Sequence, residues 1–75
     1  MTLEEFIEAF GNEFIETPLE TFNAETNYRQ IDEWNSLTAL SIISMVDDQM
    51  GKTITGADLR KFTSIKDLYN YIQSL

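Results

Sequence analysis

The chain contains no cysteine and no histidine among its 75 residues. Without cysteine it can form neither a disulfide nor a thiolate metal site. Without histidine it lacks the side chain that most often serves as a general base or metal ligand near neutral pH. These two absences argue against an enzyme, above all a small hydrolase or metal enzyme, and we expect no catalytic residue and no metal site.

Basic residues are scarce as well. Five Lys and Arg stand against 13 Asp and Glu, which gives a net charge of −8. Such a charge repels nucleic acid and anionic membranes and favours partners with basic surfaces. No apolar run approaches the length of a membrane span, and the acidic N-terminus lacks the regions of a signal peptide. We therefore expect a cytoplasmic monomer that binds no nucleic acid.

The spacing of the apolar residues indicates helices only. Seventy-five residues make one domain, residues 1–75, close to the lower size limit for a core that folds without disulfides or metals. Helical periodicity is present in three segments and a brief helix fits a fourth, at residues 2–15, 37–50, 65–75 and 57–62. Thr2 and Glu5 fit a capping box, and Gly51 is placed to end a helix in the left-handed conformation. We predict an all-α four-helix bundle with a long first loop and a short third helix.

The long loop, residues 16–35, has no clear periodicity. Thr17-Pro18 is expected to end the first helix, because the residue before proline avoids helical geometry. The acidic pair Asp32-Glu33 of the loop is typical of solvated charge. Five apolar side chains are expected to hold the loop against the bundle: Leu19, Phe22, Tyr28, Ile31 and Trp34. Gly11 lies within the first helical pattern, where it costs about 1 kcal/mol relative to Ala or permits close packing.

Ser36 stands where this loop becomes a helix. We interpret it as the N-cap, with its hydroxyl at the partly positive end of the helix dipole. A phosphate attached there would be well tolerated. The common alternative is that Ser36 merely caps the helix, since serine is among the residues most often found at that position.

The helix that follows has two apolar sides. On a helical wheel of about 100° per residue one side forms the core face: Ala39, Ile42, Ile43, Val46 and Met50. The middle of the opposite side consists of Leu37, Ser41, Ser44 and Asp48, flanked by Leu40, Met45 and Asp47. Apolar residues on a side that faces away from the core indicate a surface for a partner.

The motif Trp34-Asn35-Ser36-Leu37 resembles the modification site of the acyl carrier and peptidyl carrier protein family. In that family a serine in an Asp-Ser-Leu motif opens the second helix and carries a 4′-phosphopantetheine arm. The similarity continues without a gap through the apolar positions of the second helix and covers roughly residues 30–73. It extends more loosely to the first helix.

The resemblance implies that a phosphopantetheinyl transferase moves the arm from coenzyme A onto Ser36, with magnesium. The chain would then be a stand-alone carrier that holds an acyl or aminoacyl group as a thioester and presents it to biosynthetic enzymes. The contacts would come from the second helix, at Asn35, Leu37, Leu40, Ser41, Ser44, Met45, Asp47 and Asp48. Fatty acyl, polyketide and amino acid cargoes remain open, as does the pathway.

Asn35 departs from the family pattern, which has Asp before the serine. That carboxylate is thought to help hold the metal and coenzyme A, and Asn35 keeps an oxygen acceptor but loses the charge. The alternative function is therefore an acidic helical interaction module with no prosthetic group.

Most of the basic residues lie in the C-terminal third of the chain: Lys52, Arg60, Lys61 and Lys66. We expect these residues to be solvated or paired with Asp58 and Asp67. Phosphate binding is a further alternative for them.

Overall fold

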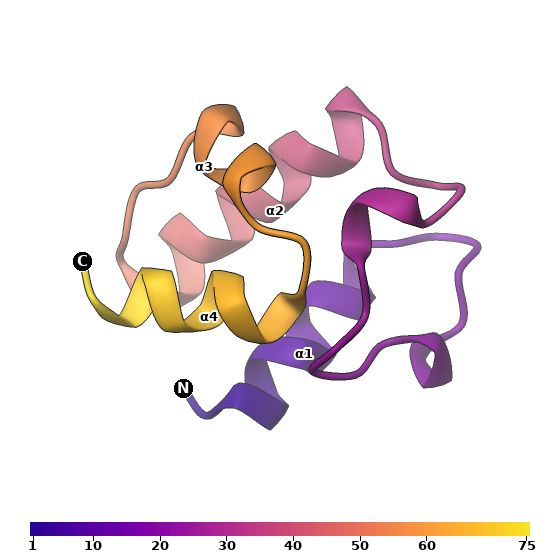
Figure 1. Ribbon diagram of the computed structural model, residues 1–75, viewed down its shortest axis with the longest axis horizontal. Coiled ribbons are helices and arrows are strands. Elements are labelled where there is room, and N and C mark those ends of the chain that lie inside the picture. The colour runs from indigo at the N-terminus through magenta and orange to yellow at the C-terminus, as the bar shows by residue number, and fades with distance from the viewer.

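The computed structural model describes all 75 residues and contains helices and no strands, which confirms the predicted all-α bundle. The helices are α1 (Leu3–Asn12), α2 (Ser36–Met50), α3 (Gly56–Lys61) and α4 (Ile65–Gln73). Two short 3-10 turns, η1 (Leu19–Thr21) and η2 (Tyr28–Gln30), interrupt the long loop. Figure 1 shows α4 beside α1, with α2 behind them, short α3 against α2, and the long loop forming the opposite side from the two termini.

The helix ends follow local chemistry. The Thr2 hydroxyl accepts a hydrogen bond from Glu5 N at 3.1 Å, and the Glu5 carboxylate accepts one from Thr2 N at 2.7 Å. The predicted capping box is thus present. Gly51 ends α2 with φ = 65°, the left-handed conformation expected from the sequence.

Aromatic side chains dominate the core. Phe6 and Phe10 of α1 are fully buried, and the Phe10 ring lies beside those of Phe14, Tyr28 and Trp34. The other buried apolar side chains come from the long loop, the connection between α2 and α3, and the remaining helices: Phe22, Ile42, Met45, Val46, Ile54, Leu59, Ile65, Leu68 and Ile72. The aromatic stripe of α1 therefore forms part of the hydrophobic core.

Gly11 is required by a close approach of the loop. A Cβ at this position would lie 2.8 Å from Leu19 Cδ2 and 2.9 Å from Phe22 Cδ2. Leu19 is half exposed and can move, whereas the Phe22 ring is buried against Phe14 with centroids 4.8 Å apart. The absence of a side chain at Gly11 lets the loop pack directly on α1.

Tyr28 anchors the loop to α3. Its hydroxyl donates hydrogen bonds to the carbonyls of Leu59, at 2.6 Å, and Phe62, at 3.0 Å. Two backbone hydrogen bonds also attach the loop, since Tyr28 N donates to Thr63 O and Lys66 N donates to Ala24 O. Burial raises the pKa of the Tyr28 hydroxyl to about 12. The long loop is thus fixed across the bundle at the two aromatic positions Phe22 and Tyr28.

Candidate functional site

Asn35, and not Ser36, caps α2. Its Oδ1 accepts hydrogen bonds from Leu37 N at 2.9 Å and Thr38 N at 3.0 Å, while its backbone stays extended. The prediction that Ser36 is the N-cap is wrong by one residue. Asparagine is as good a cap as serine, and Asn35 accepts hydrogen bonds from both free N–H groups. Ser36 is the first residue of the helix itself.

This shift frees the Ser36 hydroxyl. Ser36 is exposed, and its Oγ forms no hydrogen bond with any other group of the chain. It stays at the positive end of the α2 dipole, where negative charge is stabilised. A capping serine would have its oxygen engaged by backbone N–H groups, so the arrangement leaves Ser36 better able to form a covalent bond to an incoming group.

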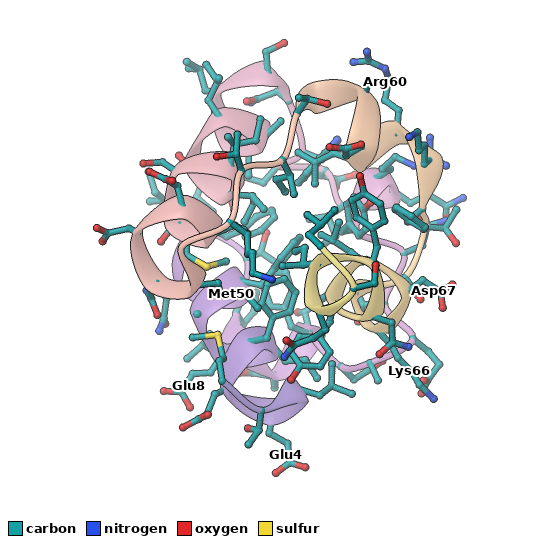
Figure 2. The ribbon with its side chains drawn as sticks, turned by 90° about the vertical axis from the view of Figure 1, so that its left-hand side faces the viewer. Glu4, Glu8, Met50, Arg60, Lys66 and Asp67 are labelled. Carbon is teal, nitrogen blue, oxygen red and sulfur yellow. The ribbon has the colours of Figure 1, made fainter.

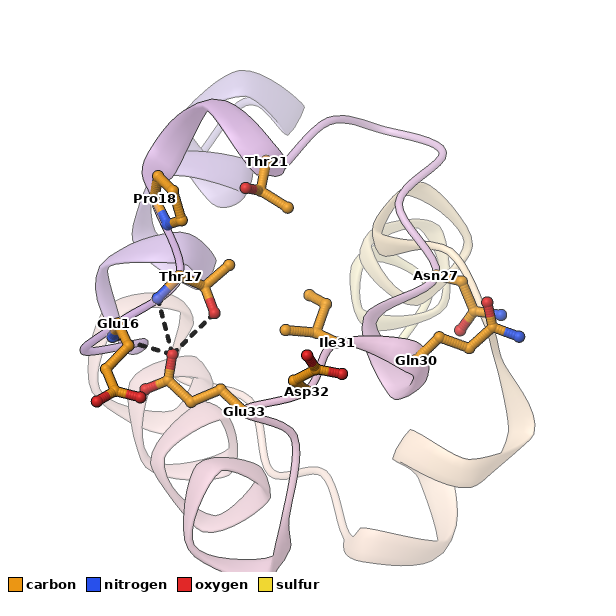
Figure 3. Close-up of a pocket in the computed structure, with 9 residues that line it drawn as sticks. All are labelled: Glu16, Thr17, Pro18, Thr21, Asn27, Gln30, Ile31, Asp32 and Glu33. Carbon is orange, nitrogen blue, oxygen red and sulfur yellow. Dashed lines mark hydrogen bonds between the residues drawn. The ribbon is translucent and has the colours of Figure 1, made fainter.

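Glu33 holds the segment before Ser36 in place. Its carboxylate accepts hydrogen bonds from the backbone N–H groups of Ile15, Glu16 and Thr17 at 2.7, 3.0 and 2.9 Å, and from the Thr17 hydroxyl at 2.8 Å. These bonds, from the Ile15 N–H above all, lower the pKa of the Glu33 carboxyl. The expectation that Asp32-Glu33 is merely solvated fails for Glu33. Figure 3 shows its carboxylate at the edge of a hollow within the loop, with the bonds to Glu16 and Thr17 drawn.

Trp34 and Thr38 fix the same segment from inside. The Trp34 ring stacks on Phe10 with an interplanar angle of 4° and meets the Tyr28 ring edge-on at 5.0 Å. The Thr38 hydroxyl, in a nearly buried side chain, donates to Glu33 O at 2.8 Å. Trp34 therefore packs against the aromatic core and holds the loop on the bundle, as predicted.

The exposed side of α2 carries most of the expected residues. Leu37 is 75% exposed and Leu40 is 60% exposed. Ser44, Asp47 and Asp48 are exposed and Ser41 is half-buried. Two apolar and two acidic side chains thus share this side of the helix.

Met45 does not belong to that surface. It is 4% exposed and lies in the core cluster, so its predicted contact with a partner is wrong. Met45 follows Ile42 by three residues and Thr38 by seven, and therefore shares their buried face. Ala39, Ile43 and Met50, predicted for the core face, are only partly buried against the cluster.

A shallow groove of about 230 Å³ adjoins Ser36 between the start of α2 and α3. Ser36 lines it together with Arg29 of η2 and Arg60 of α3, and no acidic side chain takes part. Arg29 was not singled out from the sequence, since nothing local distinguishes it. The Tyr28 bonds to α3 bring its turn to the same end of the bundle as Arg60.

Only one of the two acidic residues expected to pair with basic side chains does so. Lys61 pairs with Asp58 at 3.5 Å, as expected, whereas no ion pair reaches Asp67. The structure brings no three potential metal-ligating side chains together. None of its helices has the length and apolar character needed to cross a membrane.

A small helical bundle with a free serine hydroxyl at the start of its second helix is the architecture of a carrier domain. The family model described as "phosphopantetheine attachment site" matches residues 4–72 of the chain. The chain therefore belongs to this family, whose members carry a covalently attached 4′-phosphopantetheine. Comparison with curated proteins and with solved structures gives no match.

The residues at the start of α2 fit that group. Attachment through a phosphate needs an accessible hydroxyl, which Ser36 has, and surroundings that accept negative charge, which the helix dipole and the groove supply. Members of the family act as carriers and are not themselves catalysts.

Proposed function

We propose that Ser36 is the residue that carries the phosphopantetheine arm. The observation on which this depends is the free, exposed Ser36 hydroxyl at the first position of α2, with the cap bonds taken by Asn35. Contacts of Glu33, Trp34 and Thr38 hold the segment before Ser36 in place. A transferase would meet the hydroxyl already presented on a fixed helix end.

Loading of Ser36 follows from the chemistry of coenzyme A. A phosphopantetheinyl transferase with bound magnesium takes the proton from Ser36 Oγ, which then forms a bond to the phosphorus next to pantetheine. The pyrophosphate bond of coenzyme A breaks, and adenosine 3′,5′-bisphosphate leaves. The arm supplies a terminal thiol on which an acyl or aminoacyl group is held as a thioester. The carrier itself forms and breaks no bond of its cargo.

The exposed side of α2 is the surface that we propose for the transferase and for the loading and transferring enzymes. Leu37 and Leu40 supply apolar contact within one turn of Ser36, and Asp47 and Asp48 attract basic enzyme surfaces. Ser41 and Ser44 lie between them and complete the surface. Electrostatic complementarity of this kind sets encounter rate and choice of partner more than affinity, so binding should be weak and sensitive to salt.

Asn35 affects which transferase acts on the chain. Its Oδ1 is already shared by Leu37 N and Thr38 N, and its side chain carries no charge. It is therefore a poor ligand for magnesium, and the transferase must hold the metal with its own groups. We expect Asn35→Asp to be modified faster than wild type by a broad-specificity transferase, because aspartate restores a charged oxygen next to Ser36.

The experiment is the intact mass of the purified chain after incubation with coenzyme A, magnesium and a broad-specificity phosphopantetheinyl transferase. Wild type and Ser74→Ala should each gain one phosphopantetheine, and Ser36→Ala should gain none. Ser74 is the control because it is an exposed serine outside the α2 surface. If neither wild type nor Asn35→Asp gains the group, the carrier function is refuted and the acidic interaction module becomes the better account.

A further inference from the structure

The groove beside Ser36 differs in charge from the other three hollows of the surface. The other three hollows are lined by two or three acidic residues each and by no lysine or arginine. The Ser36 groove has two of the chain's five basic residues and no acid. In a chain of net charge −8, this is the hollow of the four in which an anion would meet the least repulsion.

Neither guanidinium in the groove is neutralised by the protein. The only ion pair of the chain joins Lys61 to Asp58, so Arg29 and Arg60 have no carboxylate within 4.0 Å. Arg60 projects from α3 at the end of the molecule opposite Glu4 and Glu8 of α1 (Figure 2). Two positive charges that line one groove and have no carboxylate partner favour an anion between them.

The backbone that carries each arginine is held in place by hydrogen bonds of neighbouring residues. Arg29 follows Tyr28, whose buried hydroxyl bonds to α3. α3 begins with a capping box in which Thr55 Oγ1 accepts from Asp58 N and the Asp58 carboxylate accepts from Thr55 N. A Cβ placed on Gly56 would lie 3.5 Å from Arg60 Nη1, so the guanidinium lies along the first turn of α3, which also lines the groove.

The end of α2 has few donors left for a phosphate. Asn35 Oδ1 already accepts from the N–H groups of Leu37 and Thr38, and Asn35 O accepts from Ala39 N. A phosphate on Ser36 Oγ therefore finds the Ser36 N–H and the helix dipole, but not the usual set of backbone donors. Guanidinium groups match phosphate oxygens in geometry and charge, so Arg29 and Arg60 can supply what the helix end does not.

We propose that Arg29 and Arg60 bind the phosphodiester that joins the arm to Ser36, and so direct the arm into the groove between α2 and α3. The inference rests on Ser36 being the attachment site. The phosphate is favoured over an anionic cargo because it is bonded to a residue that lines the groove, whereas the cargo lies at the far end of the arm. Arg29 and Arg60 are positioning residues and take no part in bond chemistry.

The test compares the apo and holo proteins by NMR after intact mass has established that the arm is present. On conversion to holo, the side-chain Nε–Hε signals of Arg29 and Arg60 should shift, and both shifts should shrink with added salt. The ³¹P signal of the arm should move in the holo Arg29→Gln/Arg60→Gln double variant. It should stay in place in Lys66→Gln, which loses one positive charge on α4 away from Arg60 (Figure 2).

Three results would overturn the proposal. One is a ³¹P signal that is identical in wild type and in the double variant. A second is a shift of the arginine signals that occurs only when the arm is loaded with a dicarboxylic acyl group such as malonyl and not with acetyl, because the anion would then be the cargo. The third is a mass spectrum without the arm on Ser36, which refutes the attachment site as well and is distinguished from the first two before any NMR measurement.

Discussion

Tyr28→Phe removes one oxygen atom and tests how the long loop is attached. The Tyr28 hydroxyl is fully buried and donates to the Leu59 and Phe62 carbonyls at the C-terminal end of α3, which the helix itself does not satisfy. Removing the donor loses the hydrogen bonds and leaves buried acceptors without a partner, at a cost of about 1–3 kcal/mol. A domain of this size has roughly 4–11 kcal/mol in total. The loss should lower the melting temperature by roughly 4–8 °C per kcal/mol.

Urea unfolding followed by tryptophan fluorescence measures this loss, because Trp34 packs against the Tyr28 ring. The midpoint should fall while the slope with denaturant stays unchanged, since the same surface is exposed on unfolding. Tyr69→Phe is the matched control, because the Tyr69 hydroxyl bonds at the exposed surface, to Met1 O and Gln73 Nε2, and its loss should change little. Equal stability of Tyr28→Phe and wild type, within 0.5 kcal/mol as an order-of-magnitude limit, would refute the proposed attachment of the loop.

The remaining predictions concern the Glu33 carboxylate, the buried and exposed sides of α2, and the surface proposed for partners. Glu33→Gln should destabilise the fold most at neutral pH, and its difference in stability from wild type should shrink as the pH falls below about 4.5. The reason is that a carboxyl group with a lowered pKa contributes stability only while it is ionised. A difference in stability that is constant from pH 7 to 3 would contradict the hydrogen bonds of the carboxylate. Met45→Ala should cost about 2–5 kcal/mol and Leu40→Ala less than about 0.5 kcal/mol in the same unfolding assay, because only Met45 is buried; equal costs would place both residues on the same side. Leu37→Ala should leave stability unchanged and slow transfer of the arm by roughly tenfold, the equivalent of about 1.4 kcal/mol. Transfer of the arm to wild type should also slow with added salt. A transfer rate that changes neither in Leu37→Ala nor with added salt would refute α2 as the docking surface.

Features governed by neighbouring residues could be predicted from the sequence. The Thr2–Glu5 capping box, the left-handed Gly51 and the aromatic stripe of α1 each depend on chemistry within one or two helical turns. The location of Ser36 at the start of α2 was predictable to within one residue. It could not be fixed further, because Asn35 and Ser36 are both good caps and only the folded backbone decides which of them meets the free N–H groups.

Features that join distant segments could not be predicted in this way. Glu33 bonds to the backbone 16–18 residues earlier, and Arg29 and Arg60 line one groove because the Tyr28 hydroxyl joins η2 to α3. The helical wheel likewise ranks residues by angle but does not say which neighbouring helices cover them. For that reason Met45, at the edge of the predicted outer side, proved to be core.

The most direct test of the central claim is to locate the arm within the chain. Cleavage after Arg29 and Lys52 gives one peptide, residues 30–52, that contains Ser36, Ser41 and Ser44. Tandem mass spectrometry of this peptide from the modified protein should assign the phosphopantetheine to Ser36 alone. Assignment to Ser41 or Ser44, or a peptide without the group in a protein that carries it elsewhere, would contradict the account.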